Sequence, residues 1–132
     1  PDTAFVPHDY QRNNVILYGN ADTHALWETL WTASDMTVHR GELRVGDRVL
    51  QGDDLGLLAI CPRRDPWTTV GVMAGTGATG QRLLQRRPYL RPAVAYPDVT
   101  VLQDRGDGIV VQGAGFLGRD WSVAAGEFVW SE

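Results

Sequence analysis

Three glycines with the spacing Gly-x-Gly-x-x-Gly, at positions 75, 77 and 80, are the strongest chemical signal in this chain. An apolar stretch, 69–74, precedes them, and a stretch with helical spacing, 81–87, follows. A glycine turn between a strand and a helix aims backbone N–H groups at an anion. Arginines one helical turn apart can complete such a site. The predicted anion ligands are Gly75, Thr76, Gly77, Gly80, Arg82 and Arg86.

The same loop has a purely structural interpretation, which we rank first: a tight turn where a helix packs closely on a strand. A dinucleotide site needs an acidic residue about 20 positions further on, and Asp104 lies near that position. However, Pro88 limits the helix to about two turns, and the chain has too few strand–helix units for two mononucleotide-binding halves. Nucleotide or phosphate binding therefore stays as the alternative, and no cofactor is assigned.

Nucleophilic and metal-binding residues carry weaker signals. The three serines at 34, 122 and 131 all lie outside the Gly-x-Ser-x-Gly elbow of α/β-hydrolases, and Cys61 precedes a proline without a catalytic signature. The histidines at 8, 24 and 39 lack the spacing of a zinc helix. We therefore predict no catalytic residue and no metal ligand, although residues of a triad assemble in space rather than in sequence.

The bulk composition indicates one globular domain. The 132 residues are 43% hydrophobic, with five tryptophans and a net charge of −4, which disfavours a nucleic-acid partner. No apolar run reaches the roughly 20 residues of a membrane span. The single cysteine leaves the redox compartment open. Because the chain starts at Pro1 without Met, we expect a processed protein or a piece of a longer one.

The order of apolar and polar segments predicts how these residues are positioned. Residues 1–13 are expected to form an extended entry arm, and 14–132 a single α/β domain. Its core would be a three-layer, Rossmann- or flavodoxin-like arrangement with a mostly parallel sheet, because several strands are apolar on both faces and alternate with helices. The predicted elements are strands near 14–18, 69–74, 99–102 and 109–111, a helical turn leading into a strand over 53–60, helices over 23–33 and 81–87, a small antiparallel hairpin near 36–50 and a glycine-rich bend over 113–118.

Several phrases together resemble the C-terminal region of large bacterial prolyl-oligopeptidase-like serine hydrolases, which have an α/β-hydrolase core. They are Asn-Val-Ile-Leu-Tyr-Gly-Asn-Ala-Asp-Thr from 14, Gly-Asp-Asp-Leu from 52, Val-Gly-Val-Met-Ala-Gly-Thr-Gly from 70, Tyr-Pro-Asp from 96 and Gly-Phe-Leu-Gly-Arg-Asp-Trp from 115. The resemblance covers about 14 to 130. In that family the nucleophile elbow lies in the hydrolase core, so no catalytic residue is carried over.

The resemblance implies a non-catalytic accessory or interaction domain of a larger serine peptidase or esterase. Its partner would be the remainder of that chain or another subunit, in the periplasm or outside the cell. The alternative from the residues alone is a small nucleotide- or phosphate-binding domain that uses the Gly75–Gly80 loop.

Overall fold

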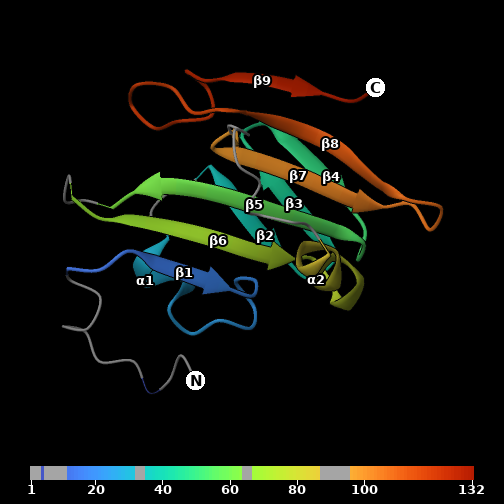
Figure 1. Ribbon diagram of the computed structural model, residues 1–132, viewed down its shortest axis with the longest axis horizontal. Helices are drawn as coiled ribbons and strands as arrows, with labels where there is room; N and C mark the ends of the chain where they lie inside the picture. Colours follow the sequence, from blue (N-terminus) through green and yellow to red (C-terminus); the bar gives the residue numbers. More distant parts are fainter. Residues whose placement is uncertain (1–3, 5–11, 32–34, 64–66, 87–95) are drawn as a thin grey trace.

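The computed structural model describes residue 4 and residues 12–31, 35–63, 67–86 and 96–132 (Figure 1). Most of the entry arm predicted over 1–13 lies outside these ranges, as does Pro88; the helix predicted over 81–87 begins earlier, at Ala78, and ends at Gln85. The described elements, in chain order, are β1 (Val15–Tyr18), α1 (Trp27–Leu30), β2 (Met36–His39), β3 (Glu42–Val45), β4 (Arg48–Gln51), β5 (Leu55–Pro62), β6 (Thr69–Gly75), α2 (Ala78–Gln85), β7 (Val99–Asp104), β8 (Ile109–Phe116) and β9 (Glu127–Trp130).

Strands dominate the structure, so the predicted three-layer α/β fold with a mostly parallel sheet is wrong. The larger sheet has six strands in the order β1-β6-β5-β7-β8-β9. Only β1 and β6 run parallel, and the other four neighbouring pairs are antiparallel. The apolar runs 69–74 and 99–102 do form central strands, but short connections join β5 to β6 and β7 to β8 as antiparallel pairs, where a parallel sheet needs helical crossovers.

The segment 36–50 forms a second sheet of three antiparallel strands, in the order β2-β3-β4. The antiparallel pairing expected here is therefore present, with one strand more than a hairpin. Gly41 and Gly46 stand in its two tight turns with φ of 76° and 59°, backbone angles that favour glycine over other residues.

The main core lies between the two sheets. Alternate side chains of the larger sheet, such as Leu17, Leu57 and Val72, point toward the small sheet, because successive strand residues face opposite sides. The small sheet contributes Met36 and Leu43. The helix predicted over 23–33 is a single turn, α1, which buries Trp27 and Leu30; residues 32–34 lie outside the described ranges.

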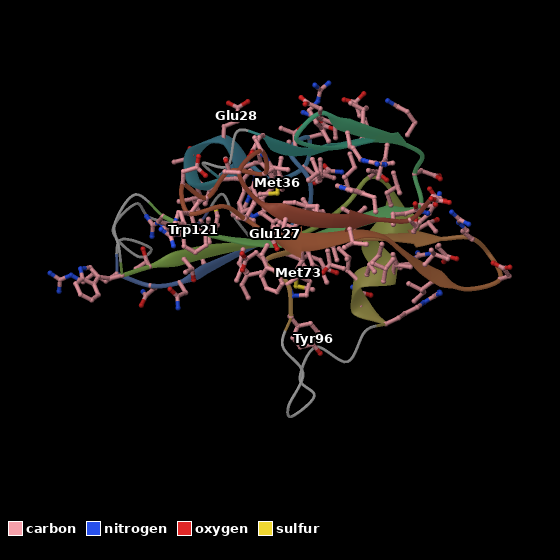
Figure 2. The ribbon with its side chains drawn as sticks, turned by 90° about the horizontal axis from the view of Figure 1, so that it is seen from above. Glu28, Met36, Met73, Tyr96, Trp121 and Glu127 are labelled. Carbon is pink, nitrogen blue, oxygen red and sulfur yellow. The ribbon has the colours of Figure 1, made fainter. Side chains whose placement is uncertain are left out.

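The opposite face of the six-stranded sheet, called the outer face below, carries α2 at one end. Leu83 and Leu84 of α2 pack on Leu102, with Leu58 and Met73 beside them. Figure 2 shows the two sides: Met36 lies on the side of the small sheet, whereas Met73 and Tyr96 lie on the outer side. The glycine-rich bend predicted over 113–118 is instead mostly strand β8.

Candidate functional site

The predicted glycine loop lines a pocket of about 580 Å³, called the loop pocket below. The pocket lies where four connections meet: the loop after β1, the turn between β2 and β3, the turn between β4 and β5, and the loop between β6 and α2. Residues from each connection form its wall, among them Asn20, Arg40, Asp53, Gly75, Thr76 and Gly77.

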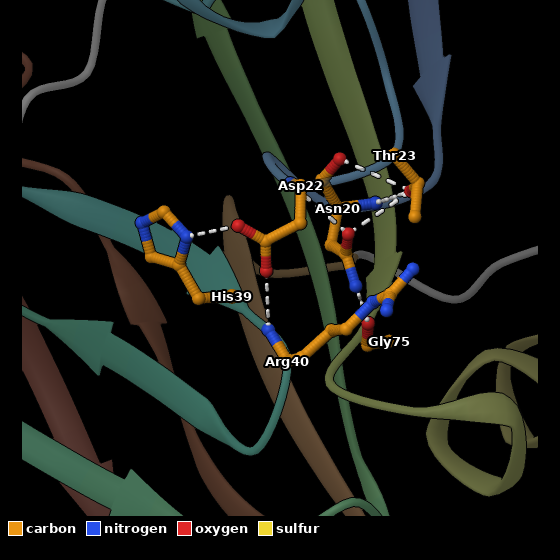
Figure 3. A network of polar contacts seen from close by, with 6 residues as sticks. All are labelled: Asn20, Asp22, Thr23, His39, Arg40 and Gly75. Atoms are coloured by element: carbon orange, nitrogen blue, oxygen red, sulfur yellow. Dashed lines mark hydrogen bonds and ion pairs between the residues drawn. The ribbon is translucent and has the colours of Figure 1, made fainter.

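Asn20 joins the loop after β1 to the glycine loop. Its side-chain Nδ2 donates a buried hydrogen bond of 2.9 Å to the carbonyl oxygen of Gly75. Its Oδ1 accepts hydrogen bonds from the hydroxyl of Thr23 (3.0 Å) and the amide of Asp22 (3.2 Å), as Figure 3 shows. With both ends of the amide group bound, the buried Asn20 holds the two loops at a fixed separation.

Asp22 ties the same loop to the β2–β3 turn. Its carboxylate lies 2.9 Å from His39 Nδ1 and accepts a 2.7 Å hydrogen bond from the amide of Arg40 (Figure 3). These hydrogen bonds, the one to His39 first, lower the pKa of Asp22 below its usual value of 3.8. The Arg40 backbone is thereby fixed, and its guanidinium stem lines the loop pocket.

Most amides around the glycine loop are bound within the chain. The amide of Gly75 donates to Gln81 Oε1 (2.7 Å), that of Thr76 to the Leu55 carbonyl (3.0 Å), and that of Gly80 to the Asp53 carbonyl (3.2 Å). These groups are therefore not directed at a ligand. Gly77 and Ala78, at the start of α2, also line the pocket.

Close packing requires all three glycines of the motif. A Cβ on Gly77 would come 2.6 Å from the Asp53 carbonyl oxygen. One on Gly80 would overlap the Leu55 carbonyl, and one on Gly75 would overlap the Gln81 amide. The start of α2 thus lies directly on the start of β5, and the spacing that predicts phosphate binding also serves this helix–strand contact.

The structure does not bring the two predicted arginines to the loop pocket. Arg82 is exposed on α2, and Arg86 lies 3.7 Å from Asp104, the residue that a dinucleotide site would direct at a ribose. Arg40 is the arginine that lines the pocket, and sequence reasoning missed it. The hydrogen bond from its amide to Asp22 brings the β2–β3 turn to the pocket, and the residues around Arg40 contain no signal of this contact.

The groups capable of nucleophilic or acid–base chemistry lie apart. Cys61 is buried in the main core, and the Ser122 hydroxyl donates to Asp120 at 2.7 Å. The Ser131 hydroxyl donates to Gln112 at 2.9 Å. Ser34 and His8 lie outside the described residues. Within the described part of the chain, no three His, Cys, Asp or Glu side chains are grouped to hold a metal ion.

The outer face is a second candidate site. One cross-strand row, a set of neighbouring paired residues that share this face, runs over all six strands and comprises Tyr18, Met73, Leu58, Thr100, Ala114 and Val129. The next row begins with Ile16, Gly71 and Ile60. Ile16 is 67% exposed, Ile60 50% and Val129 80%.

A shallow hollow of about 230 Å³ lies on this face beside α2. Its wall includes Ile16, Leu58, Ile60, Gly71, Met73 and Tyr96. The five residues of this set other than Tyr96 belong to β1, β5 and β6, and the wall also includes Pro97, Asp98 and, from β7, Thr100. Sequence periodicity could not reveal this hollow. A strand whose second apolar face is exposed has the same sequence pattern as a strand with both faces buried.

Comparison with known proteins does not identify the chain. No protein-family model matches it, and neither a curated protein nor a solved structure matches it. Across the described ranges, the helices are too short or too polar to cross a lipid bilayer.

Proposed function

We propose that this chain is a non-catalytic accessory domain of a larger periplasmic or secreted serine hydrolase, and that its outer face binds the hydrolase portion of that enzyme. The observation that carries the proposal is the row of side chains across the six strands, in which Met73, Leu58, Ala114 and Val129 are apolar. Contiguous apolar patches on soluble proteins mark interaction surfaces more often than single exposed residues do.

In the part of the chain that the structure describes, α2 covers one end of the outer face and leaves the side near β1 exposed. Ile16 and Ile60 expose at least half of their side-chain surface there, and neither has a polar atom that water could solvate. Burial of apolar surface is worth about 25 cal/mol per Å², so a partner that covers several such side chains gains several kcal/mol. A partner with an apolar surface of its own suits this face.

The positions of the nucleophilic groups support an accessory role. The Cys61 thiol faces the core, and the hydroxyls of Ser122 and Ser131 bind neighbouring polar side chains. Asp22 orients Nδ1 of His39, as a carboxylate does in a catalytic pair. His39 lies on β2, however, and the hydrogen bonds of the Ser122 and Ser131 hydroxyls go to other residues. The resemblance to the C-terminal region of prolyl-oligopeptidase-like enzymes also places the nucleophile elsewhere.

Chemical labelling tests the proposal. The coding sequence that flanks this chain gives the longer protein, in which we expect a Gly-x-Ser-x-Gly elbow. A thiol at Ile16→Cys should react with a maleimide in the isolated chain and be protected in the longer protein. The matched variant Val49→Cys, on the small sheet and 41% exposed, should react in both. Equal labelling of Ile16→Cys in both proteins would contradict the proposal.

Enzyme assays give an independent test. We expect the isolated chain to leave p-nitrophenyl esters and aminoacyl-anilides intact, whereas the longer protein hydrolyses at least one of these classes. Turnover by the isolated chain that a serine-directed inhibitor abolishes would show that the chain is itself catalytic.

Phosphate or nucleotide binding at the loop pocket is the second candidate function. The observation that favours it is Arg40, which lines the same pocket as Gly77 and Ala78 at the start of α2. Asp53 also lines this pocket, and its charge opposes that of Arg40. Because Gly77 packs on Asp53, the test variant should change Arg40 rather than a glycine.

A further inference from the structure

We infer that the loop pocket binds a free α-amino acid, whose carboxylate pairs with Arg40 and whose ammonium group pairs with Asp53. The inference goes beyond the proposed function and does not depend on what the outer face binds. Three observations carry it: two opposite charges line one pocket, hydrogen bonds fix the turns that bear them, and the pocket has the volume of a small-molecule site.

Arg40 and Asp53 are the two charged residues among the described residues that line the loop pocket. Both side chains are exposed, and within the described part of the chain neither forms an ion pair or a side-chain hydrogen bond. Figure 3 shows the Arg40 side chain extending from the β2–β3 turn toward Gly75 of the glycine loop. One wall of the pocket thus carries a positive charge and another a negative charge, each available to a ligand.

Backbone hydrogen bonds hold the turns that carry these two charges. The amide of Gly41, in the β2–β3 turn, donates to the Thr76 carbonyl of the glycine loop at 2.9 Å. The amide of Gly52, in the β4–β5 turn, donates to the Gly41 carbonyl at 3.0 Å, and the Asp53 carbonyl accepts from the Gly80 amide at 3.2 Å. A ligand that binds between fixed turns loses less affinity to ordering of the protein.

An α-amino acid matches both charges at once. Its carboxylate can accept two parallel hydrogen bonds from the planar guanidinium of Arg40, and its ammonium group can donate to the carboxylate of Asp53. The ligand is neutral overall, as is the sum of the charges that line the pocket, so binding leaves neither charge unpaired. The volume of about 580 Å³ lies in the usual range for small-molecule pockets and leaves room for the side chain of the amino acid.

Asp53 distinguishes this ligand from phosphate, the other candidate for the pocket. A phosphate group carries about 1.5 to 2 negative charges near neutral pH, so the carboxylate of Asp53 repels it. The amides of Gly75, Thr76 and Gly80, which would cradle a phosphate, are bound within the chain. A ligand with a positive group beside its carboxylate turns the Asp53 charge from a repulsion into a contact.

A primary ammonium group fits the pocket better than a quaternary one. Quaternary ammonium ions are held by the faces of several aromatic rings. Among the described residues that line the pocket, Tyr18 is the single aromatic one, and its hydroxyl accepts a hydrogen bond from Gln85. A primary ammonium group needs a hydrogen-bond acceptor instead, and the carboxylate of Asp53 is one.

NMR titration of the isolated chain tests the inference. The probes are the standard protein amino acids, added one at a time at about millimolar concentration and about pH 6.5, where the ammonium and carboxylate groups are both charged. We expect at least one of them to shift the amide signals of Gly41 and Gly77. Its N-acetyl derivative and its carboxamide each lack one of the two charges, and each should bind at least about tenfold more weakly.

Two charge variants give the matched comparison. Arg40→Gln and Asp53→Asn should each bind that amino acid at least about tenfold more weakly. They should differ toward the N-acetyl derivative, because Arg40→Gln loses the contact to its carboxylate whereas Asp53→Asn only removes a repelling charge. Arg44→Gln and Asp107→Asn change exposed residues outside the pocket wall and should bind like the original chain. The two derivatives test the same contacts on the original chain, whether or not the variants fold.

Three outcomes would overturn the inference: no shift of the Gly41 and Gly77 amides with any amino acid, derivatives that bind as tightly as the amino acid, or unchanged affinity in folded Arg40→Gln or Asp53→Asn. Inorganic phosphate that binds more tightly than every amino acid, with loss of binding in Arg40→Gln, would also overturn it and would leave the pocket to phosphate. The proposed function stands in each case, because its own test is the labelling of Ile16→Cys.

Discussion

The side chain of Asn20 and the carbonyl of Gly75 form a buried hydrogen bond of 2.9 Å across 55 positions of the sequence. This bond joins the ends of β1 and β6, the parallel pair of the larger sheet. It also sets the width of the loop pocket, because both residues line it. The pocket therefore depends on one amide side chain rather than on the glycine loop alone.

We expect Asn20→Ala to lower the free energy of unfolding by about 1–3 kcal/mol, because it leaves the buried Gly75 carbonyl without this donor. Urea denaturation followed by tryptophan fluorescence measures the change. The matched control is Asn14→Ala, which removes an exposed hydrogen bond to the amide of Thr69. Water can replace that bond, so its loss should be smaller. Equal losses of unfolding free energy in the two variants would show that the buried Asn20 hydrogen bond contributes no more to stability than the exposed one.

The sequence predicted where the main strands lie better than how they connect. The apolar runs near 14–18, 69–74 and 99–102 correspond to β1, β6 and β7. Their apolar character on both faces indicated a sheet covered on both sides, whereas among the described residues α2 covers only one end of the outer face. A partly exposed apolar face and a face buried by helices give the same pattern, so the parallel α/β interpretation was wrong.

The glycines over 113–118 show the same limit. They predicted a bend, yet Gly113 and Gly115 lie within β8, where the rings of Trp130 and Phe128 cover them. These rings stack with centroids 6.1 Å apart and belong to a strand more than ten residues away. A glycine that makes room for a distant ring cannot be distinguished, within its own neighbourhood, from one that bends the chain.

Local sequence signals predicted only some of the residues that line the loop pocket. Gly75, Thr76 and Gly77 line the loop pocket as their spacing suggested, whereas Arg82 and Arg86 do not. Helical spacing placed those two arginines near the loop in sequence, but Arg86 lies beside Asp104 of β7, and neither residue lines the pocket. The local pattern predicted a hairpin around Arg40, but the hydrogen bond from its amide to Asp22 joins two distant segments and could not be predicted locally.

Gly80→Ala should destabilise the protein by about 1–3 kcal/mol, the usual range for overpacking, or by more if α2 cannot shift. The reason is that its Cβ would overlap the Leu55 carbonyl. Thermal denaturation measures the effect. The control is Gly108→Ala, where a Cβ meets no atom within 4 Å, and where we expect a change near zero or a slight stabilisation. A Gly80→Ala protein as stable as the control would contradict the close approach of helix and strand.

The Asp22–His39 pair should make a small contribution to the free energy of unfolding that is lost at acid pH. The pKa of Asp22 is lowered in the folded state, so its contribution is fully present above its usual value of 3.8 and is lost as the pH falls through the folded pKa. Because both side chains are substantially exposed, the contribution should stay below about 1 kcal/mol.

Asp22→Asn tests this dependence through urea denaturation at several pH values. The stability gap between the original chain and Asp22→Asn should be constant from about pH 5 to 6 and narrow below 3.8. Asp107→Asn, at an exposed turn, provides the control for a general charge effect. A stability difference that widens as the pH falls would mean that folding raises the pKa of Asp22, contrary to the assigned direction.

Inorganic phosphate tests the loop pocket as an anion site. If phosphate binds there, it stabilises the folded state by RT ln(1 + [L]/Kd), about 2.7 kcal/mol at one hundred times Kd, and the melting temperature rises accordingly. Arg40→Gln should abolish this rise because Arg40 lines the pocket, whereas Arg82→Gln should retain it because Arg82 is exposed on α2.

Sodium chloride at matched ionic strength separates phosphate binding from general screening. A rise in phosphate no larger than the rise in chloride would remove the anion hypothesis. Loss of the rise in Arg82→Gln with retention in Arg40→Gln would move the site to the exposed face of α2 and away from the pocket that Asn20 and Gly75 define.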